Sequence, residues 1–150
     1  MRYTFDSSVI IKGLLEPRRK KRDSLLKEQI RIHNIASSLM EKAYNKEAGL
    51  FIPTAAIIEV ACVSSRLTGV RDIGIKTAEF VIAIATEILD EKEILRECID
   101  MAATTRISGF DSVFITCAKV TDSTLITDDK KMFDAAVKVG VEAKLLRDIG

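Results

Sequence analysis

The sequence predicts an α/β protein with a three-layer α/β/α architecture and a central, mainly parallel sheet of four to five strands. Short apolar runs rich in strand-forming residues alternate along the chain with longer segments whose apolar residues recur every three or four positions. Size is the second observation, because 150 residues, 47% of them hydrophobic, suffice for one core and are too few for two ordinary domains. We therefore expect residues 1–150 to form a single domain with helices covering the sheet.

The expected elements follow from these periodicities and from the residues that interrupt them. β-branched and aromatic runs bounded by Pro, Gly, Ser or Asp predict strands at residues 3–5, 50–52, 86–89, 124–127 and 143–146. Apolar residues at helical spacing predict helices at 9–15, 30–46, 55–67, 75–85, 94–105, 113–120 and 131–139. Pro17, Gly49 and Gly140 are expected to end helices, and residues 69–74 are expected to form a loop.

Capping patterns support three of these helix starts. Thr54 stands directly before the helix expected at 55–67. Asp90 with Glu93, and Ser108 with Asp111, have the spacing of a capping box, in which each side chain bonds a backbone N–H of the other end.

The helix expected at 55–67 is apolar nearly all round, which is typical of a buried helix, and Glu59 is its single acidic residue. A buried carboxylate is costly unless it is paired, hydrogen-bonded or bound to a metal. An internal ion pair or a neutral glutamate explains Glu59 as well as a functional role does.

Composition excludes several classes of function. Lys and Arg number 23 against 22 Asp and Glu, so the net charge of +1 provides no global field for nucleic acid or membrane. The longest apolar candidate for a membrane span, residues 80–85, is far too short, and Asp6 interrupts any signal peptide, so we expect a soluble cytoplasmic protein. The three cysteines are odd in number and widely separated in the sequence: Cys62, Cys98 and Cys117. We therefore expect them to be small buried apolar residues of a protein in a reducing compartment.

One local charge run stands out, formed by Arg18, Arg19, Lys20, Lys21 and Arg22. Such a run is usually a solvated, mobile face, and its alternative is an arm that contacts phosphates. The lone His33 has no second candidate ligand at metal spacing and is expected at the surface.

Acidic residues follow strands or open helices at four separate places along the chain: Asp6, Glu59, Asp111 and the pair Asp128–Asp129. Helix capping explains Asp6 and Asp111 without any function. In a parallel sheet, however, ligands bind outside the carboxyl ends of the strands, which is the edge at which these acids should converge. Two carboxylates about 5 Å apart at an effective dielectric near 20 repel by about 3 kcal/mol, so a cation is expected between them. All-oxygen ligands favour Mg²⁺ or Mn²⁺, which can activate water for phosphodiester hydrolysis.

The chain resembles the PIN domain family in four segments that occur in the family's order. These are Asp6-Ser7-Ser8-Val9-Ile10, Pro53 through Glu59-Val60, Gly109-Phe110-Asp111 with Ala118, and Leu125-Ile126-Thr127-Asp128-Asp129 with Phe133. The small single-domain members, notably the VapC-type toxins of toxin–antitoxin pairs, are the most similar.

This resemblance implies a metal-dependent ribonuclease in which Asp6, Glu59, Asp111 and Asp129 hold Mg²⁺ or Mn²⁺. It also implies that Ser8 and Thr127 orient these carboxylates, with Asp128 as a further supporting ligand. RNA is then the expected substrate, an antitoxin-like protein a partner, and a homodimer the expected assembly. The basic stretch from residue 18 to residue 31 is longer than the corresponding segment of compact members.

Two alternatives remain. A receiver domain needs an acid pair after its first strand, where this chain has Asp6 followed by Ser7 and Ser8. A haloacid-dehalogenase-type phosphatase needs a second Asp two residues after its nucleophile, where this chain has Ser8. Both classes are therefore less favoured. A catalytically silent PIN-like module that binds protein or RNA would be favoured by a missing acid, and all four are present.

Overall fold

A computed structural model describes all residues, 1–150, and contains one five-stranded sheet. The strands are β1 (Arg2–Phe5), β2 (Gly49–Pro53), β3 (Glu87–Leu89), β4 (Thr124–Thr127) and β5 (Ala143–Leu145). Their order is β3-β2-β1-β4-β5, and every neighbouring pair is parallel. The predicted α/β fold with a parallel central sheet is confirmed.

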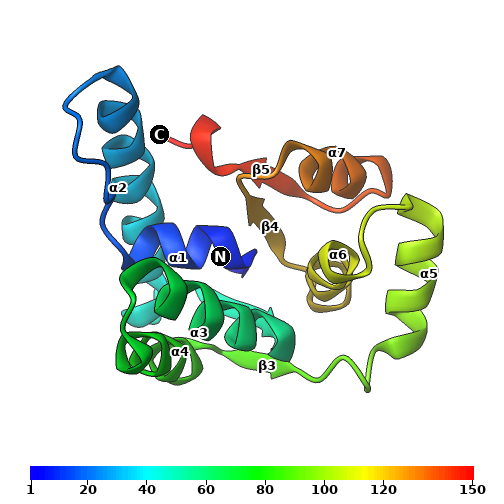
Figure 1. Cartoon of the computed structure of the whole chain (residues 1–150). Helices are drawn as coiled ribbons and strands as arrows, with labels where there is room; N and C mark the ends of the chain where they lie inside the picture. Colours follow the sequence, from blue (N-terminus) through cyan, green and yellow to red (C-terminus); the bar gives the residue numbers. More distant parts are fainter.

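Seven α-helices connect the strands and form the outer layers (Figure 1). They are α1 (Ser7–Leu14), α2 (Ser24–Tyr44), α3 (Thr54–Thr68), α4 (Arg71–Ile84), α5 (Leu95–Thr105), α6 (Gly109–Thr121) and α7 (Lys130–Lys138), and a short 3₁₀ helix, η1 (Leu146–Asp148), follows β5. Helices α1 to α4 lie together on one side of the molecule, and α5 to α7 lie on the other.

The order of the strands contains a reversal that places the candidate site. From β1 the chain moves outward through β2 to β3, and it then crosses to the opposite side of β1 to form β4 and β5. The reversal point therefore lies between β1 and β4, where Phe5 is in register with Ile126. In open α/β sheets, ligands bind at the carboxyl ends of the strands that flank such a point.

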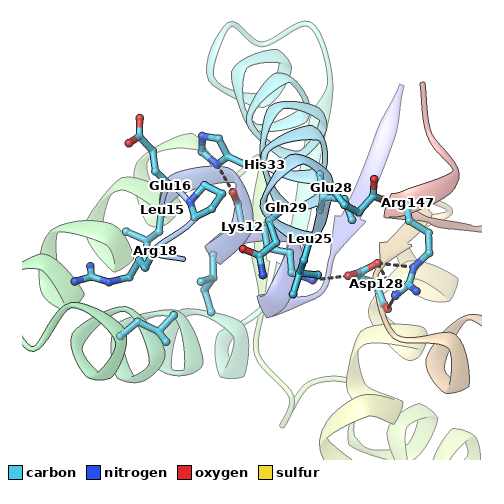
Figure 2. A pocket seen from close by; sticks show the side chains of 14 residues that line it. Lys12, Leu15, Glu16, Arg18, Leu25, Glu28, Gln29, His33, Asp128 and Arg147 are labelled. Carbon is cyan, nitrogen blue, oxygen red and sulfur yellow. Dashed lines mark hydrogen bonds and ion pairs between the residues drawn. The ribbon is translucent and has the colours of Figure 1, made fainter. Parts of the chain in front are cut away.

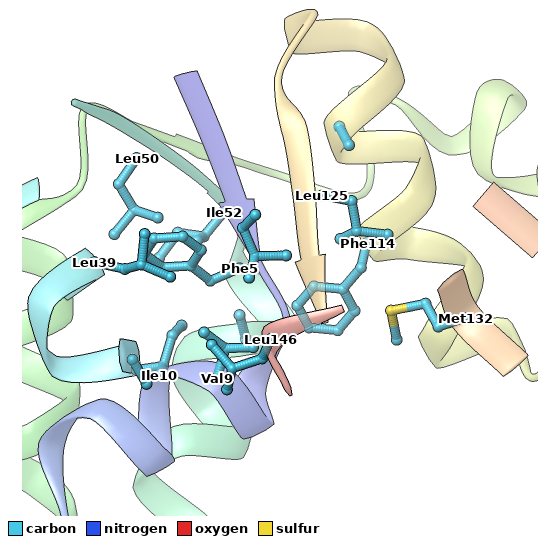
Figure 3. Packing of buried hydrophobic residues seen from close by; sticks show 14 of the residues in the cluster. Phe5, Val9, Ile10, Leu39, Leu50, Ile52, Phe114, Leu125, Met132 and Leu146 are labelled. Carbon is cyan, nitrogen blue, oxygen red and sulfur yellow. The ribbon is translucent and has the colours of Figure 1, made fainter. Parts of the chain in front are cut away.

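A continuous apolar core holds this arrangement together (Figure 3). Phe5, Leu125 and Ile126 of the central strands are fully buried, with Val9 of α1 and Phe114 of α6 packed over them. Burial of a side chain of this size contributes about 1.5–3 kcal/mol, so these residues anchor the two strands that carry the candidate site.

Helix α3 is not the buried helix that the sequence predicts. Only Ala56, Val60 and Ser64 of this helix are buried, whereas Ile58 is 71% exposed and Cys62 is exposed. Several apolar side chains of α3 therefore lie on the outside of the molecule, and only one stripe of this helix contributes to the core.

Two helix boundaries also differ from the sequence-based prediction. Helix α2 begins at Ser24, six residues before the expected start, because the carboxylate of Asp23 accepts the backbone N–H of Leu26 at 3.0 Å. Helix α4 begins at Arg71, so Gly74 lies inside a helix and not in a loop. A Cβ on Gly74 would lie 2.5 Å from the Ala61 carbonyl oxygen, so this glycine permits close packing of α3 against α4.

Of the three predicted helix caps, only that of α6 by Ser108 is found in the structure. Thr54 forms no cap bond, and the N-terminus of α3 is capped instead by Glu91, which accepts the Ala55 N–H at 2.7 Å and the Thr54 hydroxyl at 2.6 Å. Asp90 accepts the Lys92 N–H within a turn and does not cap α5. Gly49 does not end α2 but begins β2.

Two further expectations are corrected in part. Cys98 and Cys117 are buried as predicted, whereas Cys62 is exposed, and all three are free thiols. His33 is half-buried, and its Nδ1 lies 2.6 Å from the carbonyl oxygen of Lys12, in the last turn of α1. None of the helices combines the length and the apolar character that a membrane span requires.

Candidate functional site

Asp6 is the centre of the candidate site, directly after β1 and before α1. Its side chain is only 4% exposed and accepts the backbone N–H of Val9 at 3.0 Å and the hydroxyl of Ser8 at 2.6 Å. The first of these bonds is the helix cap that the sequence predicts, and the second is the orientation by Ser8 that the family resemblance implies. No cation lies against this carboxylate within salt-bridge distance.

A hydrogen-bonded connection joins Asp6 to Asp129 across the reversal between β1 and β4. The hydroxyl of Thr127, the last residue of β4, donates to the second oxygen of Asp6, and the backbone N–H of Asp129 donates to the Thr127 hydroxyl oxygen at 3.0 Å. Thr127 is fully buried, so its bond to Asp6 is shielded from water. Asp129 also caps α7 by accepting the N–H groups of Lys131 and Met132 at 2.8 and 3.2 Å.

Asp111 approaches the same edge of the sheet from the first turn of α6. The Ser108 hydroxyl accepts its backbone N–H at 3.0 Å, which confirms half of the predicted capping box, and the Asp111 carboxylate forms no return bond to the Ser108 N–H. Burial raises the pKa of Asp111, and the negative charges of Asp129 and Asp6 raise this pKa further. The structure therefore places these three acids within electrostatic reach of one another, with their repulsion uncompensated.

Glu59 is placed differently from the other predicted acids. It lies in the second turn of α3, is half-buried, and forms no hydrogen bond or ion pair. No three His, Cys, Asp or Glu side chains of the chain lie close enough together to hold one metal ion. In this arrangement Asp6, Asp111 and Asp129 lie near one another without forming a closed ligand shell, and no contact joins Glu59 to them.

Asp128 is engaged by two cations that the sequence did not point to. Its carboxylate forms ion pairs with Lys12 of α1 and with Arg147 of η1, and its backbone oxygen accepts a further bond from Arg147 at 2.8 Å (Figure 2). These contacts depend on how α1 and η1 each meet the turn after β4, which neither periodicity nor motif spacing reveals. Asp128 thus holds two cations beside the acids, whereas the carboxylate of Asp129 caps the N-terminus of α7.

The basic run Arg18–Arg22 lies in the loop between α1 and α2. Arg19 pairs with Asp23, and the bond lowers the pKa of that carboxyl group below its usual value. Arg18, Lys20, Lys21 and Arg22 are exposed and form no ion pair.

The donor set of the acidic edge fits a hard divalent cation. All its donors are oxygens, the charges on Asp6, Asp111 and Asp129 lack a counter-ion, and the buried hydroxyl of Ser7, next to Asp6, has no hydrogen-bond partner. Mg²⁺ commonly takes one or two carboxylates and fills its other positions with water, so an open set of acids suits this ion.

Comparisons with known proteins agree with this geometry. A family model described as "PIN domain" matches residues 3–138. VapBC2 from Rickettsia felis, solved bound to a promoter DNA fragment, contains a similar chain with 14% identity and a TM-score of 0.61, covering 97% of this chain and 98% of that one. VapBC-1 from nontypeable Haemophilus influenzae gives 18% identity, a TM-score of 0.61 and coverage of 97% and 98%. FitAcB from Neisseria gonorrhoeae gives 16% identity, a TM-score of 0.60 and coverage of 98% and 99%. These identities establish likeness of fold, and no curated protein sequence matches the chain.

Proposed function

Because the chain belongs to the PIN domain family, we propose that it is an endoribonuclease that uses Mg²⁺ or Mn²⁺ to hydrolyse phosphodiester bonds in RNA. The observation that carries this proposal is the connection Asp6–Thr127–Asp129 across the reversal between β1 and β4. It holds Asp6 and the backbone of Asp129 beside each other at the edge where parallel sheets bind ligands, and the negative charges of both residues raise the pKa of Asp111.

The reaction would proceed by attack of water on phosphorus. The bond from phosphorus to the 3′-oxygen breaks, and the products are a 3′-hydroxyl and a 5′-phosphate. A bound divalent cation would supply charge neutralisation at the phosphate and a water of lowered pKa.

The chain's own residues have distinct parts in this reaction. Asp6, Glu59, Asp111 and Asp129 are the candidate metal-holding groups, of which at most two could contact one ion directly in the present arrangement. Ser8 and Thr127 hold the two oxygens of Asp6 in place. Burial and the nearby charges of Asp129 and Asp6 raise the pKa of Asp111, which is the direction expected where a cation is needed among carboxylates.

We also propose that the exposed cations of the loop Arg18–Arg22 contact RNA phosphates. This local charge matters because the chain as a whole carries a net charge of only +1. A protein partner of antitoxin type is inferred from the similar chains in VapBC2 and FitAcB. Pull-down of the tagged chain from its native cell, followed by mass spectrometry, tests for that partner, and light scattering tests the expected homodimer.

The deciding experiment is cleavage of a mixed RNA pool by the purified protein in Mg²⁺, in chelator, and with the variant Asp6→Asn. We expect at least about a hundredfold loss of rate both in chelator and in the variant. Asp100→Asn, which removes an exposed carboxylate from α5, is the matched control and should cleave at the wild-type rate.

Activity that survives both chelator and Asp6→Asn would refute the metal-site assignment. Absence of cleavage by the wild type, with RNA or partner binding retained equally in wild type and Asp6→Asn, would instead support a catalytically silent binding module.

A further inference from the structure

A cavity of about 440 Å³ lies beside the acidic edge, between the end of α1, the loop that follows it and the first half of α2 (Figure 2). Its size falls within the range of about 300–1,000 Å³ that is usual for small-ligand sites. Six apolar side chains line it: Ile11, Leu15, Pro17, Leu25, Ile32 and Leu67. None of these residues belongs to the proposed catalytic set.

The wall nearest the acids presents accessible positive charge. Lys12 and Arg147 share the single carboxylate of Asp128, which leaves this cluster with a surplus of one positive charge. The side chains of Lys12 and Arg147 are 41% and 52% exposed, whereas that of Asp128 is 11% exposed. Glu28 also lines this side of the cavity, but its carboxylate is paired with Arg31 at 2.7 Å, so an anion that enters the mouth on this side meets Lys12 and Arg147 and no unpaired carboxylate.

This wall is continuous with the proposed catalytic site. Asp128 stands between Thr127, which bonds Asp6, and Asp129. The cavity and the acidic residues thus lie on either side of the carboxyl end of β4. Arg18 lies at the opposite rim, on the side away from Asp128, where the exposed basic loop begins (Figure 2).

Polar groups that could form hydrogen bonds with a flat heterocycle also line the cavity. The Gln29 amide makes no hydrogen bond in the structure, so its donor and acceptor are both available. His33 lies nearby with one ring nitrogen turned to the Lys12 carbonyl oxygen, and its second nitrogen makes no bond. Apolar walls with a few polar groups at the edge match a nucleobase, which has apolar faces and a polar rim.

We propose that this cavity holds one unpaired nucleobase of the substrate RNA, adjacent to the cleaved bond, while Lys12 and Arg147 contact the phosphate of that nucleotide. This inference rests on the proposed ribonuclease function and adds to it a base-reading subsite. RNA is favoured over an apolar protein segment as occupant because the apolar walls end at the exposed cations Lys12 and Arg147, and because the rim formed by Glu16 and Arg18 continues into the basic loop, which suits an apolar base carried on a phosphate backbone.

The test uses one RNA that the wild type cleaves and a series of copies, each with one abasic position. For the wild type, kcat/KM should fall about tenfold at one position beside the cleavage site and change little elsewhere. In the variant Leu25→Glu, which places a charge in the cavity wall at a half-exposed residue, removal of that same base should have no further effect. Leu95→Glu on α5, at a residue of similar exposure, is the matched control and should keep the wild-type profile.

A second variant guards against a folding defect and tests base reading directly. Gln29→Leu removes the free amide from an exposed position of α2, and it should change which base is preferred at that position without changing the thermal unfolding midpoint.

Identical abasic profiles in the wild type and Leu25→Glu, with cleavage that is still abolished by chelator, would overturn the subsite and leave the ribonuclease function intact. Loss of a co-purifying protein from Leu25→Glu with an unchanged abasic profile would assign the cavity to a protein segment and would also overturn the subsite. Failure of the wild type to cleave any RNA would overturn the function itself.

Discussion

A single hydroxyl group, that of Thr127, links the two halves of the candidate site. It donates to Asp6 and accepts from the Asp129 N–H, so it fixes the relative positions of residues that lie on either side of the strand reversal. Partners that orient metal-binding side chains typically affect metal affinity or activity by 10–100-fold, which sets the scale of its expected contribution.

Thr127→Val, which preserves shape and removes the hydroxyl, should lower Mg²⁺-dependent cleavage about 10–100-fold. It should also lower the free energy of unfolding by about 1–3 kcal/mol, because a buried oxygen of the Asp6 carboxylate loses its hydrogen-bond donor. Thr77→Val is the control, since the buried Thr77 hydroxyl only bonds a carbonyl of its own helix. Steady-state kinetics and urea denaturation measure both effects, and equal loss of activity in the two variants would contradict the role of Thr127.

Thiol reactivity should separate the three cysteines at the residue scale. Burial raises the pKa of Cys117 to about 12 and also raises the pKa of Cys98, whereas Cys62 is exposed. Because only the thiolate reacts and a raised pKa reduces the thiolate fraction, roughly 1 in 10⁴ of Cys117 would be reactive at pH 8. Iodoacetamide at pH 8 should modify Cys62 alone in the folded protein and all three cysteines in urea, as read by peptide mass spectrometry. Alkylation of Cys117 at the rate of Cys62 would contradict the buried placement.

Among the elements, the crossing of α3 over α4 depends on the absence of a side chain at Gly74. Replacement of a helical glycine by alanine normally stabilises by about 1 kcal/mol, but here the new Cβ would lie 2.5 Å from the Ala61 carbonyl oxygen and 2.8 Å from the Ser65 Cβ. The clash should outweigh the propensity, so we expect Gly74→Ala to destabilise by about 1–3 kcal/mol in urea denaturation. Gly109→Ala, at a helical position with no atom within 4 Å of the new Cβ, should be neutral or stabilising.

The elements also show how far local sequence predicts this fold. The strands around Phe5, Leu50 and Leu125 were predicted because each is an apolar run with a clear break on both sides. The start of α4 was missed because Gly74 reads as a loop residue. Its real role is close packing against Ala61 and Ser65 of α3, a contact that the local sequence pattern does not reveal.

The same distinction applies to the candidate site. Strand ends predicted that Asp6 and Asp129 share an edge, because the carboxyl ends of parallel strands meet there. The ion pairs of Asp128 with Lys12 and Arg147, and the cap of α3 by Glu91, join segments far apart in the sequence, so no local pattern could indicate them.

For the whole molecule, the uncompensated acids predict that divalent cations stabilise the folded state. At a hundredfold excess over Kd, a ligand that binds only the folded state adds about 2.7 kcal/mol, which for this chain length corresponds to a rise in Tm of roughly 5–10 °C. Differential scanning calorimetry with Mn²⁺ or Mg²⁺ should show this rise for the wild type and for Asp100→Asn, and a much smaller rise for Asp111→Asn. KCl at matched ionic strength separates specific binding from simple screening of the acids. An equal rise in wild type, Asp111→Asn and KCl would argue against a bound cation.

The pairing of β1 with β4 has a consequence for synthesis of the protein. Asp6 and Thr127 are 121 residues apart, so the carboxylate acquires this partner only after the whole segment between them has been made. Closure of so long a loop is slow compared with local helix formation. On the ribosome, the growing polypeptide therefore lacks an assembled acidic centre until β4 and Thr127 have been translated. A fragment that stops before β4 would lack this connection, so the proposed activity would begin only after β4 has been made and has paired with β1.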